Sequence, residues 1–337
     1  MPRDEILRRI ADSLAAVGVT DLATRSLGGL SGGQLQKVAC AQALAQHTDI
    51  LLFDEPTSNL DAATIDELAT LLAKLKAEGK TILIAEHRLY FLCGLVDTVV
   101  LMDNGEAKHC FSGDEFFALT NTQRKDLGLR TLTPPQLKVS TASAAGCDGV
   151  TIEELSITIG RRTILDIDNL VFPKGAVTGI IGVNGIGKIT LARVLCGLHK
   201  PDRGAVVRGL SLKPKVPDAF LVMQDVHRQL FAESVSAEAD VEYLSQVGLE
   251  EFAHRHPLSL SGGQKQRLVI ATALASGAQV LLFDEPTSGV DYRHLDMIAT
   301  QLRNLAQAGK TVIVISHDVE FLNHCADQVV DRSQYQP

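Results

Sequence analysis

Hydrophobic and polar residues alternate along this chain in segments of helix length and strand length. Between residues 4 and 17 the apolar side chains recur every three or four positions on one face, as in an amphipathic helix: Ile6, Leu7, Ile10, Leu14 and Val17. Helical patterns also cover residues 31–46 and 62–77, while apolar runs typical of buried strands cover 50–53, 81–85 and 99–102. Strands that alternate with helices predict an α/β fold, a mainly parallel sheet with helices on both faces.

A long internal repeat organises the sequence. Residues 31–61 recur as residues 261–291, with 18 of 31 positions identical, and the offset of 230 continues without a gap to His87 and His317. The repeat predicts two copies of one domain. Met1 aligns with Phe231, so roughly 80 residues before Phe231 have no counterpart in the first copy. We expect a fragment of a longer tandem protein, with a decayed gene as the alternative.

The repeat also predicts the domain boundaries. Residues 1–107 form the C-terminal part of a truncated first domain, and residues 150–337 form the second domain. Residues 108–149 lose the alternating pattern and contain Thr133-Pro134-Pro135, so we expect a linker with one small helix near residues 114–119.

Composition excludes several classes of protein. The 337 residues carry a net charge of −8, which argues against a general nucleic-acid binder. No run of 18 apolar residues predicts a membrane span, and the charged N-terminal residues do not form a signal peptide. The six cysteines lack C-x-x-C spacing, which indicates reduced thiols in the cytosol rather than a disulfide or metal framework.

A glycine-rich loop between an apolar strand (176–181) and a predicted helix is the first candidate for chemistry. It contains Gly182, Val183, Asn184, Gly185, Ile186, Gly187, Lys188, Ile189 and Thr190. Its backbone N–H groups and the helix N-terminus would hold a phosphate, with Lys188 reaching the β- and γ-phosphates. The usual pattern has a hydroxyl residue after the lysine as a Mg²⁺ ligand, but here that residue is Ile189. Thr190 lies about 100° further around the helix, so it points elsewhere.

Polar residues at the ends of three apolar strands are the next candidates. Asp284 and Glu285 follow a buried strand in the second copy, where α/β sheets bind ligands. Asp284 is placed to hold Mg²⁺, and Glu285 to polarise an attacking water. Gln224 follows the strand 219–223 and would contact Mg²⁺ or the water, and His317 would sense the γ-phosphate. An acidic helix cap and a solvated histidine are the alternative interpretations.

Leu-Ser-Gly-Gly-Gln occurs at residues 30–34 and 260–264, each about 20 residues before a strand that ends in Asp-Glu-Pro-Thr-Ser. With the glycine loop, these motifs make the chain resemble the ATP-binding-cassette (ABC) ATPases over nearly its whole length. The resemblance implies a P-loop fold with a helical signature subdomain and the cofactors ATP and Mg²⁺. It also implies that the second copy's loop faces a signature from the first copy, namely Ser31, Gly32, Gly33 and Gln34, with Asp61 beside it.

The resemblance also implies an incomplete second site. The first copy keeps Asp54, Glu55 and His87 but has no glycine loop, so we expect no ATP there unless another ATPase chain supplies one. The family usually stacks adenine on an aromatic residue before the loop. Residues 150–171 contain none, so Ile157 or Ile159 would take that position.

Residues 84–90 (Ile-Ala-Glu-His-Arg-Leu-Tyr) and 191–198 resemble the tandem ATPases of energy-coupling-factor importers for cobalt and vitamins. This implies an ATP-hydrolysing subunit at the inner face of the cell membrane, bound to integral membrane transporter subunits and not to nucleic acid. The alternatives are a soluble tandem ABC protein that acts on ribosomes and a nucleotide-binding remnant impaired by Ile189. The residues do not identify the transported substrate.

Overall fold

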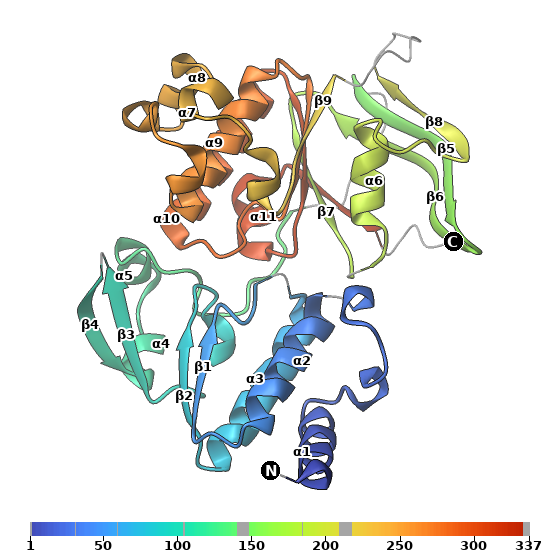
Figure 1. Cartoon of the computed structure of the whole chain (residues 1–337). Coiled ribbons are helices and arrows are strands. Elements are labelled where there is room, and N and C mark those ends of the chain that lie inside the picture. The colour runs from blue at the N-terminus through green and yellow to red at the C-terminus, as the bar shows by residue number, and fades with distance from the viewer. Residues whose placement is uncertain are drawn as a thin grey trace. The chain divides into compact units, whose positions relative to one another are not determined.

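The computed structural model describes residues 2–30, 32–58, 60–103, 105–139, 148–183, 185–208 and 218–332. Figure 1 shows the chain with its elements labelled. It forms two compact units. Unit 1 comprises residues 1–135 with 291–293, and unit 2 comprises residues 136–290 with 294–337.

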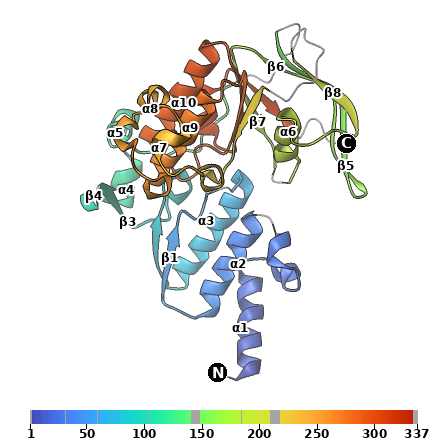
Figure 2. The same ribbon diagram turned by 45° about the horizontal axis from the view of Figure 1, so that its top comes forward.

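Unit 1 is built on a short parallel sheet with helices against one face. Its elements are α1 (Arg3–Ala16), α2 (Gly32–Ala45), β1 (Ile50–Asp54), α3 (Ala62–Ala77), β2 (Thr81–Ala85), β3 (Thr98–Asp103), β4 (Glu106–Ser112), α4 (Gly113–Phe117) and α5 (Asn121–Asp126). In the described part of the chain, β1 and β2 form a two-stranded sheet, with Ile50 opposite Thr81 and Asp54 opposite Ala85. Figures 1 and 2 both show α2 and α3 side by side.

The core of unit 1 lies between these helices and one face of the β1–β2 sheet. Phe53, Ile82 and Ile84 pack against a cluster that includes Leu68 and Leu72 of α3. Helix α3 begins where the Asp61 side chain accepts a hydrogen bond from Thr64 N, the usual role of an N-cap residue. This cluster therefore covers only one of the two faces of the sheet.

Unit 2 is larger, and its described residues form two sheets. Its elements are β5 (Gly149–Ile159), β6 (Arg162–Pro173), β7 (Val177–Ile181), α6 (Lys188–Leu195), β8 (Arg203–Arg208), β9 (Ala219–Val222), α7 (Val235–Glu238), α8 (Val241–Gln246), α9 (Gly262–Ala275), β10 (Val280–Asp284), α10 (Tyr292–Gln307), β11 (Thr311–Ile315), α11 (Val319–Cys325) and β12 (Gln328–Asp331). The main sheet is parallel, in the order β12-β7-β11-β10-β9, and β6-β5-β8 form an antiparallel sheet.

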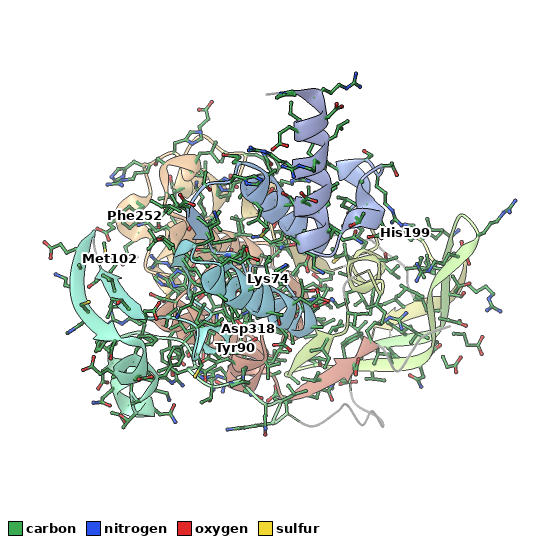
Figure 3. The ribbon with its side chains drawn as sticks, turned by 90° about the horizontal axis from the view of Figure 1, so that it is seen from below. Lys74, Tyr90, Met102, His199, Phe252 and Asp318 are labelled. Atoms are coloured by element: carbon green, nitrogen blue, oxygen red, sulfur yellow. The ribbon has the colours of Figure 1, made fainter. Side chains whose placement is uncertain are left out.

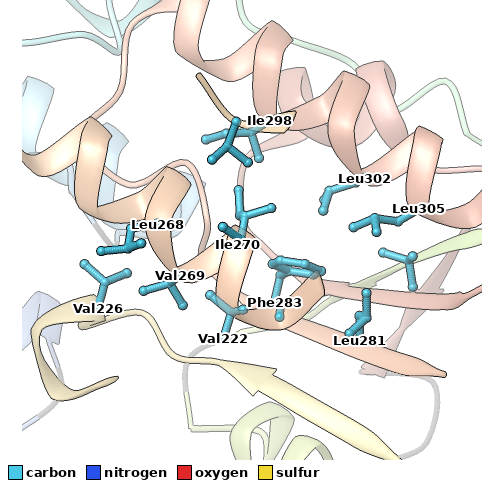
Figure 4. Close-up of a cluster of buried hydrophobic side chains, with 14 of the residues drawn as sticks. Val222, Val226, Leu268, Val269, Ile270, Leu281, Phe283, Ile298, Leu302 and Leu305 are labelled. Carbon is cyan, nitrogen blue, oxygen red and sulfur yellow. The ribbon is translucent and has the colours of Figure 1, made fainter. Parts of the chain in front are cut away.

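Both faces of the main sheet of unit 2 are covered. On one face, Leu281 and Phe283 of β10 pack with α9 and α10, as the close-up in Figure 4 shows. On the other face, Leu282 of β10 packs in a cluster formed by β5, β6, β7 and α6. The clusters explain why the strands of this sheet are continuous apolar runs, because parallel strands are usually buried on both sides.

The predicted α/β fold is confirmed, and most predicted elements lie where the pattern placed them. Helix α3 and strand β2 have the predicted bounds, and the small helix expected near residues 114–119 is α4. The pattern missed the β5–β6 hairpin, strand β4 and helix α5, and β4 and α5 lie within the span read as linker. The domain boundaries at 107 and 150 stay a prediction.

Candidate active site

The glycine loop joins β7 to α6 in unit 2, as predicted. Gly182, Gly185 and Gly187 have φ angles of 144°, 81° and 97°, which favour glycine strongly over other residues. At Gly187 a Cβ atom would lie 2.9 Å from Leu165 Cδ2, so the loop packs tightly against β6. Helix α6 begins at the next residue, which directs its first N–H groups toward the loop. Asn184 lies outside the described residues.

Lys188 places its charge inside this loop. The side chain is buried, and its Nζ donates to the carbonyl oxygens of Gly182 at 2.5 Å and Val183 at 3.3 Å. Nζ is also 2.8 Å from Nε2 of His317, at the end of β11. A buried amine, backbone N–H groups and a helix N-terminus thus converge on one place, an arrangement that suits a phosphate anion.

Glu285 is held from two sides at the end of β10. Its carboxylate accepts a 3.0 Å hydrogen bond from Ser316 Oγ and a 3.2 Å bond from the His317 backbone N–H. The His317 ring lies 3.8 Å from the same carboxylate. The sequence predicted Glu285 and His317 but missed Ser316. A hydroxyl residue at the strand end, directly before the histidine, was the signal that could have found it.

Asp284 is buried and the Glu285 side chain is only 13% exposed, and this burial raises the pKa values of both carboxylates. Burial raises the pKa of Asp284 to about 6, opposed by the charges of Lys188 and Arg193. Burial raises the pKa of Glu285 to about 7, opposed by the Ser316 hydrogen bond and increased by the Asp284 charge. A carboxylate with a pKa near neutral pH can accept a proton from a bound water.

The residues present fit nucleotide phosphates well and Mg²⁺ in part. Mg²⁺ is usually held by one or two carboxylates together with substrate phosphates, and Asp284 can supply the carboxylate. Within the described ranges, no three His, Cys, Asp or Glu side chains gather closely enough to hold a metal ion by themselves. Ile189 is 47% exposed and offers no oxygen where the hydroxyl is expected. Gln224 is exposed just after β9, and its role stays a prediction.

The first copy repeats the backbone of this site with different side chains around it. Glu55 and Glu285 share left-handed φ angles of 43° and 46°. Glu86 stands where the second copy has Ser316, and its carboxylate accepts from Thr57 N at 3.0 Å and His87 N at 2.7 Å. Burial raises the pKa of Glu55, the His87 charge opposes this rise, and the charges of Glu86 and Asp54 add to it.

The signature residues of the first copy lie in unit 1, at the start of α2. Gly32 is the first residue of this helix, and a Cβ atom at Gly33 would lie 3.2 Å from Thr64 Cγ2. Gln34 is half-buried, and Asp61 caps α3. Ser31 lies outside the described residues. That these residues face the glycine loop of unit 2 stays a prediction.

The expected adenine contact needs a correction. Ile157 is 1% exposed and belongs to the core formed by β5, β6 and α6, so it cannot contact a bound base. Ile159, two residues later on β5, is 55% exposed. Of the two predicted residues, Ile159 is the one available to a nucleotide.

A family model and two curated relatives that match this chain are all named for transporters or their ATP-binding proteins. The family model named ABC transporter matches residues 4–58 and 165–288. A protein of Treponema denticola, provisionally named an ABC transporter ATP-binding protein, is 36% identical, and the match covers 98% of this chain and 72% of that protein. A protein of Bacillus subtilis, provisionally named an HMP/thiamine import ATP-binding protein, is 28% identical over 98% of this chain and 69% of its own length.

Two of the solved structures with a similar fold are not named as transporter ATP-binding proteins. An RNase-L inhibitor is 25% identical, with a TM-score of 0.68, over 97% of this chain and 67% of its own. A chain from a complex described as ribosome-bound archaeal Pelota and ABCE1 is 25% identical, with a TM-score of 0.71, over 97% of this chain and 58% of its own. None of the helices in the described part of this chain is long and apolar enough to cross a membrane.

Proposed function

Because the chain belongs to the family of ABC transporter ATP-binding proteins, we propose that it is the ATP-hydrolysing subunit of a membrane importer. The family consists of P-loop ATPases that use ATP and Mg²⁺. The proposed importer is of the energy-coupling-factor type and takes up a vitamin or a metal ion. The full-length similarity to a protein provisionally named for HMP/thiamine import supports this choice. The chain would then act at the cytoplasmic face of the membrane, bound to integral membrane subunits.

The observation that carries the catalytic part of the proposal is the meeting of Lys188, His317 and Glu285 at the strand ends of unit 2. Lys188 binds the β- and γ-phosphates. Glu285 accepts the proton of the attacking water. The His317 ring, which lies 2.8 Å from Lys188 Nζ and 3.8 Å from the Glu285 carboxylate, positions the γ-phosphate. Mg²⁺, when bound, neutralises charge on the phosphate oxygens, and Asp284 is the carboxylate that would hold it. Gly32, Gly33, Gln34 and Asp61 would close the site from unit 1.

A variant pair from the two copies tests this assignment. Glu285→Gln keeps the size of the side chain but removes the proton acceptor, so ATP turnover should fall by about 10²- to 10⁴-fold. Glu55→Gln is the matched control, because Glu55 occupies the same backbone position in the copy without a glycine loop. The measurement is phosphate release under saturating ATP and Mg²⁺. Equal effects of the two substitutions, or none from Glu285→Gln, would contradict the assignment.

Ile189 requires its own test, because it removes one Mg²⁺ ligand from the loop. Ile189→Thr restores a hydroxyl at a position that is already 47% exposed, so the fold should tolerate the change. We expect Ile189→Thr to raise turnover and to lower the Mg²⁺ concentration needed for half-maximal activity. Ile189→Val is the control, since it changes the size without adding an oxygen. Similar activity in all three proteins would show that the hydroxyl is dispensable here.

A second candidate function is a soluble tandem ABC protein that acts on ribosomes. The similarity in fold to the RNase-L inhibitor and to a chain of a ribosome-bound complex favours it. Affinity purification from detergent-solubilised cells distinguishes the two functions. Recovery of integral membrane proteins supports the importer, whereas co-sedimentation with ribosomes in the presence of non-hydrolysable ATP supports the alternative.

A further inference from the structure

Unit 1 contains a cavity of about 150 Å³ beside the end of α1, between α2 and α3. Along α3 its lining extends from Leu60, two residues before the helix begins, to the exposed Lys74, which Figure 3 labels. Along α2 it extends from Gly33 to Cys40, and Val17, directly after α1, also lines it. The cavity therefore lies where three helices of unit 1 meet.

Several polar side chains that line this cavity already have partners. Thr64 Oγ1 donates to Asp61 at 2.7 Å, and Lys37 forms an ion pair with Glu67. Cys40 is buried, and burial raises the pKa of its thiol to about 11, so the thiol is uncharged at neutral pH. A water molecule in a cavity needs roughly two to four polar partners, so these walls suit an apolar occupant better than water.

The second copy has bulkier or longer side chains at the equivalent positions. The counterparts of Cys40, Thr64 and Leu71, 230 positions later, are Ile270, His294 and Gln301. Ile270 is buried in the core of unit 2, where its side chain fills more volume than a cysteine would. The His294 ring lies against Gly263, since a Cβ atom there would be 3.4 Å from it. Gln301 Nε2 donates to Gln246 O at 3.4 Å, which links α10 to the end of α8.

Arg267 of the second copy shows the difference most directly. It is the counterpart of Lys37, and its Nη1 donates to the carbonyl oxygen of Val247 at 2.9 Å. Val247 is the counterpart of Val17, which lines the cavity, whereas Lys37 pairs with Glu67 on α3. Long side chains thus cross the equivalent space in unit 2, and helices flank this space in both copies. The cavity of unit 1 therefore results from the side chains at these positions.

We propose that this cavity binds a neutral apolar molecule about the size of one aromatic ring. A cavity of about 150 Å³ with apolar walls is large enough for benzene. A charged ligand would lose its hydration there, and the charges of Lys37 and Glu67 already neutralise each other. The lining residues belong to unit 1, whereas the glycine loop belongs to unit 2, so this inference is independent of the function proposed above.

Fluorine NMR of fluorobenzene with the full chain tests the proposal, and we expect a dissociation constant of about 1 mM or lower. Cys40→Ile introduces the residue of the second copy and takes up part of the cavity, so it should weaken binding at least about tenfold. Cys93→Ile is the matched control, because Cys93 is exposed in the same unit and lies outside the lining. The probe 4-fluorobenzoate adds a negative charge to the same ring and should bind at least about tenfold more weakly.

A variant that enlarges the cavity tests the proposal from the opposite direction, and it decides the question if Cys40→Ile prevents folding of unit 1. Leu71→Ala removes apolar atoms from the wall, so it should bind 1-fluoronaphthalene at least about tenfold more tightly than the unchanged chain does. The absence of fluorobenzene binding would overturn the proposal, as would binding that a folded Cys40→Ile variant retains or that Cys93→Ile weakens equally. Tighter binding of 4-fluorobenzoate, or no gain for the larger ring with Leu71→Ala, would overturn it as well.

Discussion

The repeat allows one leucine to be tested in two environments. Leu52 of β1 and Leu282 of β10 occupy equivalent positions in equivalent strands, 230 residues apart. Leu282 is 1% exposed within the cluster formed with β5, β6 and α6, whereas Leu52 is 73% exposed. Leu52→Ala and Leu282→Ala therefore remove the same atoms from the same backbone setting, once from solvent and once from a packed core.

The expected losses of stability differ several-fold. Replacement of a fully buried leucine by alanine typically costs about 2.7–5 kcal/mol, because a cavity adds to the lost transfer free energy. Complete burial of a leucine contributes about 1.5–3 kcal/mol. Since only about a quarter of the Leu52 side chain is shielded, its truncation should cost less than about 1 kcal/mol.

The assay must follow each unit separately, because a protein with two compact units need not unfold in one step. Hydrogen exchange measured on peptides along a urea series gives a midpoint for each unit. With a slope of about 1–3 kcal/mol per molar urea, Leu282→Ala should lower the midpoint of unit 2 by about 1 M or more. Leu52→Ala should lower the urea midpoint of unit 1 only by a few tenths of the shift that Leu282→Ala causes in unit 2.

Equal shifts in the two units would refute this reasoning. They would show that the purified chain already buries Leu52, for example through self-association. A large shift for Leu52→Ala that disappears on dilution would identify self-association directly, because the covered state then depends on protein concentration.

Three further predictions concern individual residues. Gly187→Ala should weaken ATP binding and lower the free energy of unfolding by about 1–3 kcal/mol, because the new methyl group would contact Leu165. Both quantities can be measured by calorimetry. Gly277→Ala is the control, because Gly277 also has a positive φ but no atom lies within 4 Å of the added Cβ. The Ser316 hydrogen bond lowers the pKa of Glu285, so Ser316→Ala should raise this pKa and shift the pH profile of ATP turnover to higher pH. Ser316→Thr keeps the hydroxyl and should restore the original pH profile. Among the described cysteines, Cys93 and Cys110 are exposed and Cys40 is buried, and burial raises the pKa of the Cys40 thiol to about 11. At pH 8, Cys93 and Cys110 should therefore react with a thiol reagent about 100-fold faster than Cys40. This difference in reaction rate should become smaller as the pH is raised toward 11.

The sequence predicts helices and strands most accurately where the hydrophobic pattern lies between residues that start or end an element, such as an N-cap residue or a glycine. Helix α3 was predicted at its observed bounds because an amphipathic run lies between the N-cap Asp61 and Gly79. Strand β4 was missed because six of its seven residues are exposed, so its pattern shows no buried face. Helix α5 was also missed, although Thr120 and Gln123 form a capping box that its sequence spacing could have revealed.

The site was predicted unevenly for a similar reason. Motif spacing identified Lys188, Glu285 and His317, and the structure brings these three together in unit 2. Ser316 belongs to no motif of its own, and only its hydrogen bond to Glu285 reveals it. Ile157 and Ile159 alternate with polar residues, so the sequence places both on the same face of β5. The pairing of β5 with β6 shifts register between Ile157 and Thr158, and Ile157 is 1% exposed while Ile159 is 55% exposed, a difference that the alternating pattern does not contain.

The two copies separate what a motif determines from what its surroundings determine. Glu55 and Glu285 share the left-handed φ, and each donates its backbone N–H to the neighbouring strand, at 2.8 Å to Ala85 and 2.9 Å to Ile315. The local sequence therefore sets the turn in both copies. The Glu285 side chain is nevertheless 13% exposed and the Glu55 side chain 38%, and only Glu285 feels the charge of a loop lysine. Residues 149–195 supply that lysine, so the two equivalent carboxylates have different electrostatic environments although their backbone conformation is the same.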